Sequence, residues 1–171
     1  MKKIVIRRLV AYMIDYIIIA IYAILLFGIA TIFNFKKIPL TPISAQLVGF
    51  ISLTLPVFFY FFLSEQSKTR ATVGKRILNI SVRSDSQNSK PHVLTRNILK
   101  LLPWEIAHTG VHWIVFYSKS DQNPPVWVWI TLILPQVIIV IYLISIVISG
   151  GKSSLYDKVS NTKIEMNQPI E

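Results

Sequence analysis

The sequence predicts an all-α integral membrane protein with four transmembrane helices and with both chain termini in the cytoplasm. Two features of the composition predict this class: 53% of the 171 residues are hydrophobic and only 15% are charged, whereas roughly a quarter are charged in a soluble domain. A third is that the apolar residues form long stretches. Such a chain is not intrinsically disordered. Its net charge of +10 does not indicate a nucleic-acid binder, because the apolar residues occur in long blocks and are not dispersed along the chain as in a soluble domain.

Four segments are candidates for membrane crossing, which takes about 20 predominantly apolar residues. Residues 10–33 contain a single charged residue, Asp15, and residues 43–63 and 126–149 contain none. The remaining candidate, residues 98–117, is less apolar because it carries Lys100, Glu105, His108 and His112. We expect one domain over residues 1–171, with a loop at 64–97 and a tail at 150–171.

The distribution of Lys and Arg supports the crossing by residues 98–117. Four basic residues precede the first candidate span, eight lie between Lys68 and Lys100, and three follow the last span, which is 15 of the 18 in the chain. The other three are Lys36, Lys37 and Lys119. Because basic residues accumulate on the cytoplasmic side, four crossings with cytoplasmic termini give the best partition. The expected location is the cytoplasmic membrane of a bacterial cell.

The basic loop at 64–97 contains a pattern typical of a strand. Leu78, Ile80 and Val82 alternate with polar residues, a period of two that indicates a half-buried strand. The polar run SDSQNSK at 84–90 favours a turn, and residues 92–94 would form the return strand of a short β-hairpin. Residues 162–164 of the tail are a further candidate for pairing nearby.

The same loop contains Gly74 and Lys75, which we compared with phosphate-binding loops. A Walker A loop requires a glycine five positions earlier and Ser or Thr after the lysine, but here position 69 is Thr and position 76 is Arg. The basic residues of this region are therefore interpreted as a topology signal, with contacts to anionic lipid headgroups at the cytoplasmic face.

Two groups of ionisable residues fall within candidate spans, where a charge is costly and requires a partner, water or a function. In the first helix, Arg8 and Asp15 are seven residues apart and share one face with Tyr12 and Tyr22. We expect these four side chains to form a polar seam that runs inward from the cytoplasmic end.

The second group is Glu105, His108 and His112, whose spacing places all three on one face of a helix. Three alternatives remain open. The group is a hydrogen-bonded cluster that holds helices together, a proton or cation relay, or a site for a divalent transition metal with a further ligand such as Asp15. No cofactor other than such a metal is indicated. The chain has no nucleophile elbow, HExxH motif or dinucleotide loop, so no catalytic residues are assigned and an enzyme is not favoured.

The order of several motifs resembles the RDD family of membrane proteins. The motifs on which this resemblance rests are Arg8 to Asp15 (RLVAYMID), the run at 72–82 (TVGKRILNISV), the segment at 94–97 (LTRN), and Leu155 to Lys158 (LYDK) with Thr162. The resemblance implies that Arg8 and Asp15 are the family's Arg and first Asp, and that Asp157 is its second Asp. Gly74 and Lys75 belong to the motif at 72–82. The family as such carries no settled biochemical activity.

The functional expectation is transport or proton-coupled cation exchange, with Asp15 and Glu105 as carriers and His108 and His112 as relay groups. The alternative is a non-transporting scaffold or regulatory subunit whose polar residues hold the helices together, and a third is a membrane metal-binding protein or enzyme. The expected partners are the lipid bilayer and either a second copy of the chain or another membrane protein, with no nucleic acid.

Overall fold

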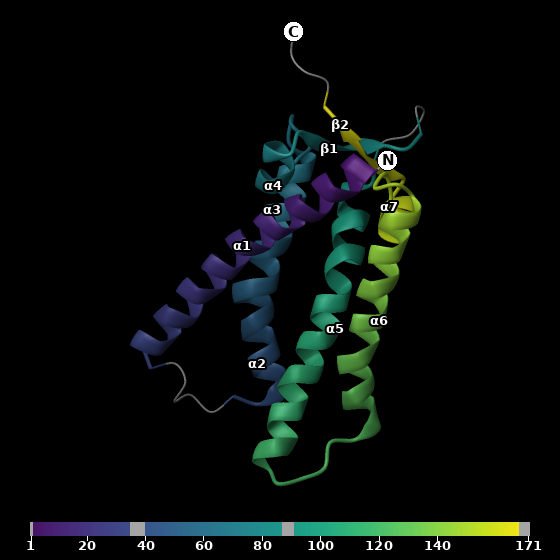
Figure 1. Ribbon diagram of the computed structural model, residues 1–171. Coiled ribbons are helices and arrows are strands. Elements are labelled where there is room, and N and C mark those ends of the chain that lie inside the picture. The colour runs from purple at the N-terminus through teal and green to yellow at the C-terminus, as the bar shows by residue number, and fades with distance from the viewer. Residues whose placement is uncertain (1, 35–39, 87–90, 168–171) are drawn as a thin grey trace.

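The computed structural model describes residues 2–34, 40–86 and 91–167, and it is built mainly from long helices (Figure 1). Three are continuous: α1 (Lys2–Ile32), α5 (Val93–Lys119) and α6 (Val126–Ile148). The second long segment runs as α2 (Pro42–Gly49), the π-helical turn η2 (Phe50–Thr54) and α3 (Leu55–Gln66). The predicted segments at 10–33, 43–63, 98–117 and 126–149 correspond to these helices, although α1 and α5 begin earlier than predicted.

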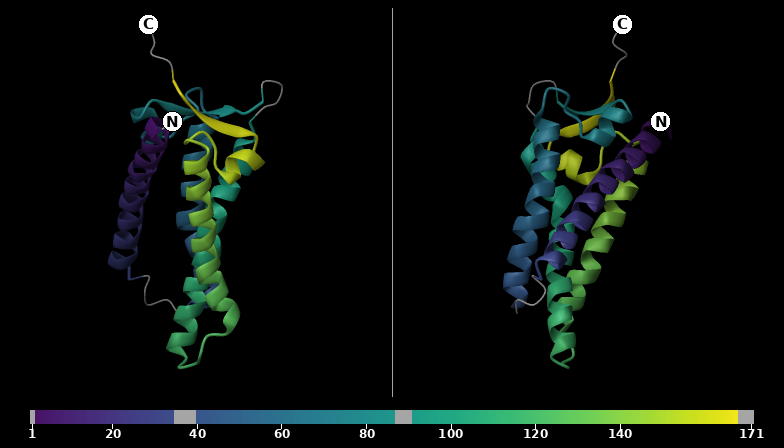
Figure 2. Two further views of the ribbon diagram at one scale, coloured as in Figure 1. Left: turned by 45° about the vertical axis from the view of Figure 1, so that its right-hand side comes forward. Right: turned by 90° about the vertical axis from the view of Figure 1, so that its left-hand side faces the viewer.

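Short elements cover one end of these helices, which we call the sheet end. They are α4 (Val73–Ile77), β1 (Ile80–Ser84), α7 (Leu155–Val159) and β2 (Thr162–Met166). The beginning of α1 and the end of β2 lie at this same end (Figures 1 and 2). The connection between α5 and α6 lies at the opposite end, as expected for antiparallel neighbours joined by a short loop.

Among the described residues, three helical segments are long and apolar enough to cross a membrane: Lys3–Ile32, Pro42–Gln66 and Val126–Ile148. In their most apolar windows only 6%, 22% and 11% of the residues are buried inside the protein. Side chains such as Ile24 and Ile148 are 69% and 76% exposed. Surfaces this apolar need a hydrocarbon environment rather than water. The helix α5 has a similar length but is less apolar, because it contains Lys100, Glu105, His108 and His112.

Helix α1 packs on α4 at the sheet end and leans away from the other long helices toward its far end (Figure 1 and the left view of Figure 2). The helices α5 and α6, in contrast, pack along each other. The first helix is therefore held chiefly at its beginning, where its polar residues lie.

Two prolines inside the helices leave backbone carbonyls without their usual helical donor, and tyrosine hydroxyls donate hydrogen bonds to these carbonyls. Pro56 and Pro103 have no N–H to donate to the carbonyl four residues earlier. The hydroxyl of Tyr22 donates to the Ser52 carbonyl at 2.5 Å, and the hydroxyl of Tyr142 donates to the Leu99 carbonyl at 3.1 Å. The fourth predicted member of the polar seam, Tyr22, thus links α1 to η2.

The sheet corrects the predicted hairpin. Strand β1 pairs antiparallel with β2 from the tail, and Val82 lies opposite Ile164. Residues 92–94 form no return strand, because His92 precedes the first turn of α5 and Val93 begins the helix. The pairing of residues 162–164 was predicted and is confirmed. The tail supplies the partner because Ile164 completes a buried core with Ile80, Val82 and Ala11 of α1.

Candidate functional site

Polar residues gather in three clusters along the protein interior. The ion network at the sheet end consists of Arg8, Glu65, Lys75, Arg96 and Asp157. The Asp15 cluster consists of Asp15, Tyr60, Thr72 and Gly74. The relay group on α5 consists of Glu105, His108 and His112. The charged residues of the ion network and Asp15 are buried, whereas apolar side chains of the long helices such as Ile24 and Ile148 face outward.

Asp157 lies at one centre of the ion network. Its Oδ2 accepts a hydrogen bond from Nη2 of Arg8 at 2.5 Å, and Arg96 forms an ion pair with its other oxygen. Ser154 caps α7 and donates to the same carboxylate from its backbone N–H at 2.8 Å and its hydroxyl at 3.0 Å. A capping box therefore fixes the carboxylate that receives the arginine of α1.

Glu65, at the end of α3, is the second centre. Its Oε2 accepts hydrogen bonds from Nε of Arg96 at 2.8 Å and from Nδ2 of Asn97 at 3.0 Å, and its Oε1 pairs with Lys75. Cations and carboxylates alternate along the network, which joins α1, α7, α5, α3 and α4. All five charged side chains are buried. Removing one member of such a network leaves an uncompensated buried charge.

The electrostatics of the network act on two residues outside the long helices. Burial, reinforced by the nearby Arg96, lowers the pKa of Lys75 although Glu65 opposes the shift. Burial disfavours the tyrosinate form of Tyr156, but Arg8, Arg96 and Lys100 outweigh it and lower the pKa of Tyr156 to about 7. The Tyr156 hydroxyl accepts a hydrogen bond from Arg8 at 2.9 Å and hydrogen-bonds to Tyr12.

Asp15 accepts hydrogen bonds from three neutral donors. The hydroxyls of Tyr60 and Thr72 donate to it at 2.7 Å and 2.6 Å, and the backbone N–H of Gly74 donates at 2.9 Å. Only glycine fits at position 74, because a Cβ there would lie 2.2 Å from the carbonyl oxygen of Ala11. The predicted seam of α1 is therefore divided: Arg8 and Tyr12 join the ion network, whereas Asp15 attaches α4 to α1.

The relay group follows α5 away from the sheet end. Glu105 accepts a hydrogen bond from the Thr54 hydroxyl at 2.9 Å, and its Oε2 lies 3.9 Å from Nδ1 of His108. The Nε2 atoms of His108 and His112 are 3.0 Å apart. Nδ1 of His108 is buried and has no hydrogen-bond partner among the described residues.

The relay group lies in one line rather than around one centre. Within the described parts of the chain, no three His, Cys, Asp or Glu side chains are grouped so that they could hold a metal ion. Asp15, the further ligand considered from the sequence, instead contacts α3 and α4. Neighbouring members of the relay group nevertheless lie close together, Glu105 beside His108 and His108 beside His112.

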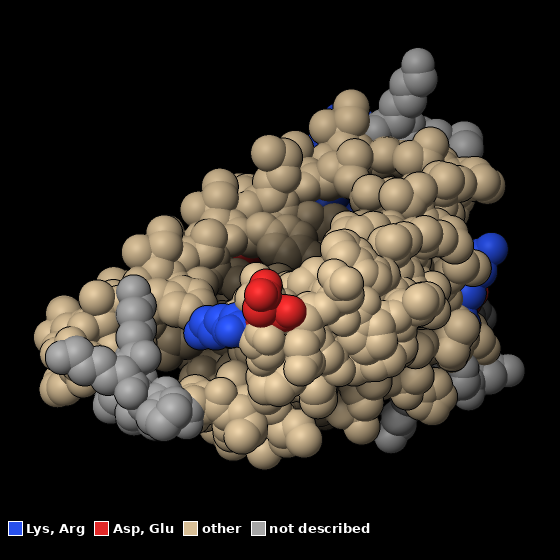
Figure 3. Space-filling model, turned by 90° about the horizontal axis from the view of Figure 1, so that it is seen from below, with Lys and Arg blue, Asp and Glu red and all other residues tan. Residues whose placement is uncertain are grey.

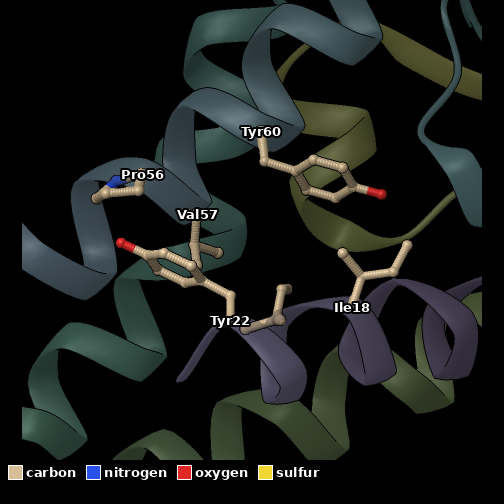
Figure 4. Close-up of a pocket in the computed structure, with 6 residues that line it drawn as sticks. Ile18, Tyr22, Pro56, Val57 and Tyr60 are labelled. Carbon is tan, nitrogen blue, oxygen red and sulfur yellow. The ribbon is translucent and has the colours of Figure 1, made fainter. Parts of the chain in front are cut away.

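Two of the cavities among the described residues lie between α1 and the other helices. The smaller, about 240 Å³, is lined by residues of α1 and α3, with Tyr22 facing Pro56 and Val57 across it (Figure 4). The larger, about 400 Å³, lies among α1, η2, α3, α5 and α6 and includes Lys100, Thr54 and Trp104 in its wall. Seen from the end opposite the sheet, the surface consists mostly of uncharged residues, with a hollow beside α1 (Figure 3).

Lys75 was assigned to a family motif and interpreted as a contact for lipid headgroups, and the structure buries it against Glu65. Other important residues were not predicted from the sequence as site residues. Glu65, Arg96 and Lys100 were not singled out. A usable signal was present for Glu65, which directly follows the second apolar segment, and for Arg96, which lies within one of the motifs.

The apolar helices and the charged interior define the class, which is a helical membrane protein with a buried ionic core at one end. The RDD family model matches residues 4–161, so the chain belongs to the RDD family. Arg8, Asp15 and Asp157 all fall within the matched range. No match was found among curated proteins or among solved structures.

Proposed function

We propose that the chain crosses a cytoplasmic membrane four times, with the sheet end in the cytoplasm. The 27 residues of α5 extend about 40 Å, which is enough to span a bilayer. Its polar residues reduce its hydropathy, but Glu105 and His108 face α2 and η2 rather than lipid. The basic residues concentrated near the sheet end favour the cytoplasmic side for it.

We further propose that the protein transports a small solute in exchange for protons, with the relay group carrying the proton. The observation behind this proposal is the line from Glu105 through His108 to His112. A carboxylate and an imidazole both bind protons reversibly. The 3.9 Å separation between Glu105 and His108 exceeds a hydrogen bond, so the two side chains must approach each other for a proton to pass.

In this proposal Asp15 is a structural residue rather than a carrier. Its oxygens already accept three hydrogen bonds from Tyr60, Thr72 and Gly74. Exchange of a monovalent cation for protons is the form of transport to test first, with Glu105 as the carboxylate that binds and releases the proton.

Proton flux in reconstituted vesicles tests the proposal. Purified protein is placed in liposomes containing a trapped pH-sensitive dye, and a gradient of Na⁺ or K⁺ is imposed. We expect the wild type to move protons and Glu105→Gln to abolish the flux. Glu165→Gln is the matched control, because this carboxylate on β2 is 47% exposed and pairs only with Lys163 among the described residues. Wild-type flux in Glu105→Gln would disprove the assigned role.

A second variant tests the geometry of the relay without removing a titratable group. A Cβ on Gly49 would lie 2.4 Å from Cε1 of the His108 ring. Gly49→Ala therefore displaces His108 from His112, and we expect the flux to fall while the carboxylate is retained. Unchanged flux would mean that the distance between the two imidazoles does not matter.

The ion network favours a second candidate function, a membrane scaffold or regulatory subunit. Five elements are joined through buried charges, which suits a protein that presents its sheet end to a partner. This candidate predicts no flux in the wild type, and Glu105→Gln would then change only thermal stability or assembly with itself or another membrane protein. Metal analysis of the wild type and His108→Ala distinguishes the third candidate, a metal-binding protein.

A further inference from the structure

Lys100 places a basic nitrogen inside the protein without a carboxylate in direct contact among the described residues. Among the described residues, the fully buried carboxylates Asp15, Glu65 and Asp157 equal the fully buried basic residues Arg8, Lys75 and Arg96 in number. The side-chain nitrogen of Lys100 is a further buried basic group. It has neither a hydrogen-bond partner nor an ion-pair partner among the described residues.

Aromatic rings, rather than anions, surround this ammonium group. Its Nζ lies 3.1 Å from the centre of the Phe61 ring and 5.5 Å from the centre of the Tyr12 ring. Cation–π contacts attract the charge but supply no oxygen acceptor. An unpaired ammonium in a low-dielectric interior is costly, so the position favours an anion that arrives from outside the chain.

The larger cavity provides the space for such an anion. Lys100 and Phe61 lie at its sheet-end side, and Ala107 and Ala23 lie farther along their helices. Seven residues of α5 separate Lys100 from Ala107, which corresponds to about 10 Å. Most of the lining residues are apolar. The cavity therefore combines a cationic end with an elongated apolar wall, at a place where α1 leans away from its neighbours (Figure 1).

We propose that this cavity binds a single-chain amphiphile with an anionic headgroup, such as a fatty acid. The headgroup would pair with the ammonium of Lys100, and the tail would extend between α1 and α5 toward Ala107. This inference concerns binding alone and does not depend on the proposed transport. One chain of an anionic phospholipid offers the same chemistry, but the volume of about 400 Å³ favours the single-chain ligand.

Tryptophan quenching tests the proposal directly, because Trp104 lines the cavity. The full chain is placed in phosphatidylcholine nanodiscs and titrated with a brominated fatty acid, its methyl ester, or a brominated phosphatidylglycerol. We expect the acid to quench at lower concentration than the ester. Quenching by the phosphatidylglycerol at still lower concentration would support the headgroup chemistry and identify the phospholipid as its source.

Lys100→Met removes the charge and keeps the length of the side chain. We expect it to weaken binding of the acid about tenfold, the scale of one charge-assisted hydrogen bond, and to leave the ester unchanged. Lys119→Met is the matched control, since Lys119 is an exposed lysine on the same helix. Ala107→Phe, which fills the far end of the cavity, should also weaken acid binding, and it decides the question if Lys100→Met does not fold.

Three results would overturn the proposal. Equal quenching of the wild type by acid and ester would show that the headgroup charge is not recognised. Equal binding of the acid by wild type, Lys100→Met and Ala107→Phe would show that neither end of the cavity is used. Acid-specific quenching that persists in Trp104→Phe would place the ligand near another tryptophan.

Discussion

At the scale of single residues, the interior is held together by buried carboxylates that each interact with several donors. Asp157 pairs with Arg8 and Arg96 and accepts a hydrogen bond from Ser154, which caps α7. Glu65 pairs with Arg96 and Lys75 and accepts a hydrogen bond from Asn97. Arg96 connects the two carboxylates, so a change at either one leaves a guanidinium partly unpaired. Conservative substitutions within the network should therefore have large effects.

Asp157→Asn tests this expectation. The amide keeps the shape but removes the charge that balances Arg8 and Arg96, and we expect a loss of about 3–5 kcal/mol in the free energy of unfolding. Denaturation of the detergent-solubilised protein measures it. Asp121→Asn is the control, because Asp121 is exposed and its φ of 52° also suits asparagine. Similar stabilities for the two variants would contradict a role for the network in stability.

Tyr156 gives the network a dependence on pH. Its pKa of about 7 in the folded protein lies below the ordinary value of 10.0. Between these values the folded state carries fewer protons than the unfolded state, so this tyrosine contributes stability that increases with pH. The contribution is complete above pH 10.0 and is lost as the pH falls through about 7.

We therefore expect tyrosinate absorbance in the folded protein to appear near pH 7, and this first step should be missing in Tyr156→Phe. A spectrophotometric titration of the two proteins checks it. Tyr117→Phe serves as the control, because that ring packs against Trp113 and Phe116 on α5, outside the network. A first step that remains in Tyr156→Phe would assign the titration to another group.

At the scale of elements, the contact between α1 and α4 depends on the small size of Gly74. This glycine allows the helices to approach until its N–H reaches Asp15. The contact holds the beginning of α1, and the rest of the helix leans outward beside the two cavities. The position of α1 is therefore determined near one end.

Gly74→Ala should separate α1 from α4. The added Cβ would lie 2.2 Å from the Ala11 carbonyl oxygen, and overpacking of this kind costs roughly 1–3 kcal/mol. Gly28→Ala is the matched control in α1, since no described atom lies within 4 Å of the position of its Cβ. We expect thermal melting to show a lower midpoint for the first variant only. A control that melts earlier than Gly74→Ala would refute this explanation.

At the scale of the whole molecule, the short elements, the beginning of α1 and the end of β2 lie at one end. The proposed topology places that end in the cytoplasm and the α5–α6 connection outside. Because the chain contains no cysteine, single cysteines report the side of each end. Asp121→Cys in living cells should react with a membrane-impermeant maleimide, whereas Lys152→Cys should react only after the membrane is opened. The reverse pattern would invert the topology.

The architecture was largely predictable because its signals are local. Each apolar stretch corresponds to a long helix, and the alternation at Ile80 and Val82 predicted β1. The return strand was wrong because strand pairing depends on which distant segment completes the core, and Ile164 does so. The motifs identified Arg8, Asp15 and Asp157, but spacing along one helix gave no information about the residues that each would meet.

The sequence by itself determined the membrane class, the positions of the apolar helices and the basic end, because hydropathy and charge are properties of contiguous residues. Only the tertiary structure decided the charge pairs. Arg8 and Asp157 are 149 positions apart, and Glu65 meets residues of both α4 and α5. A buried charge requires a partner, but the packing of distant helices decides which one it finds. The same packing leaves Lys100 beside a cavity without a carboxylate of its own among the described residues.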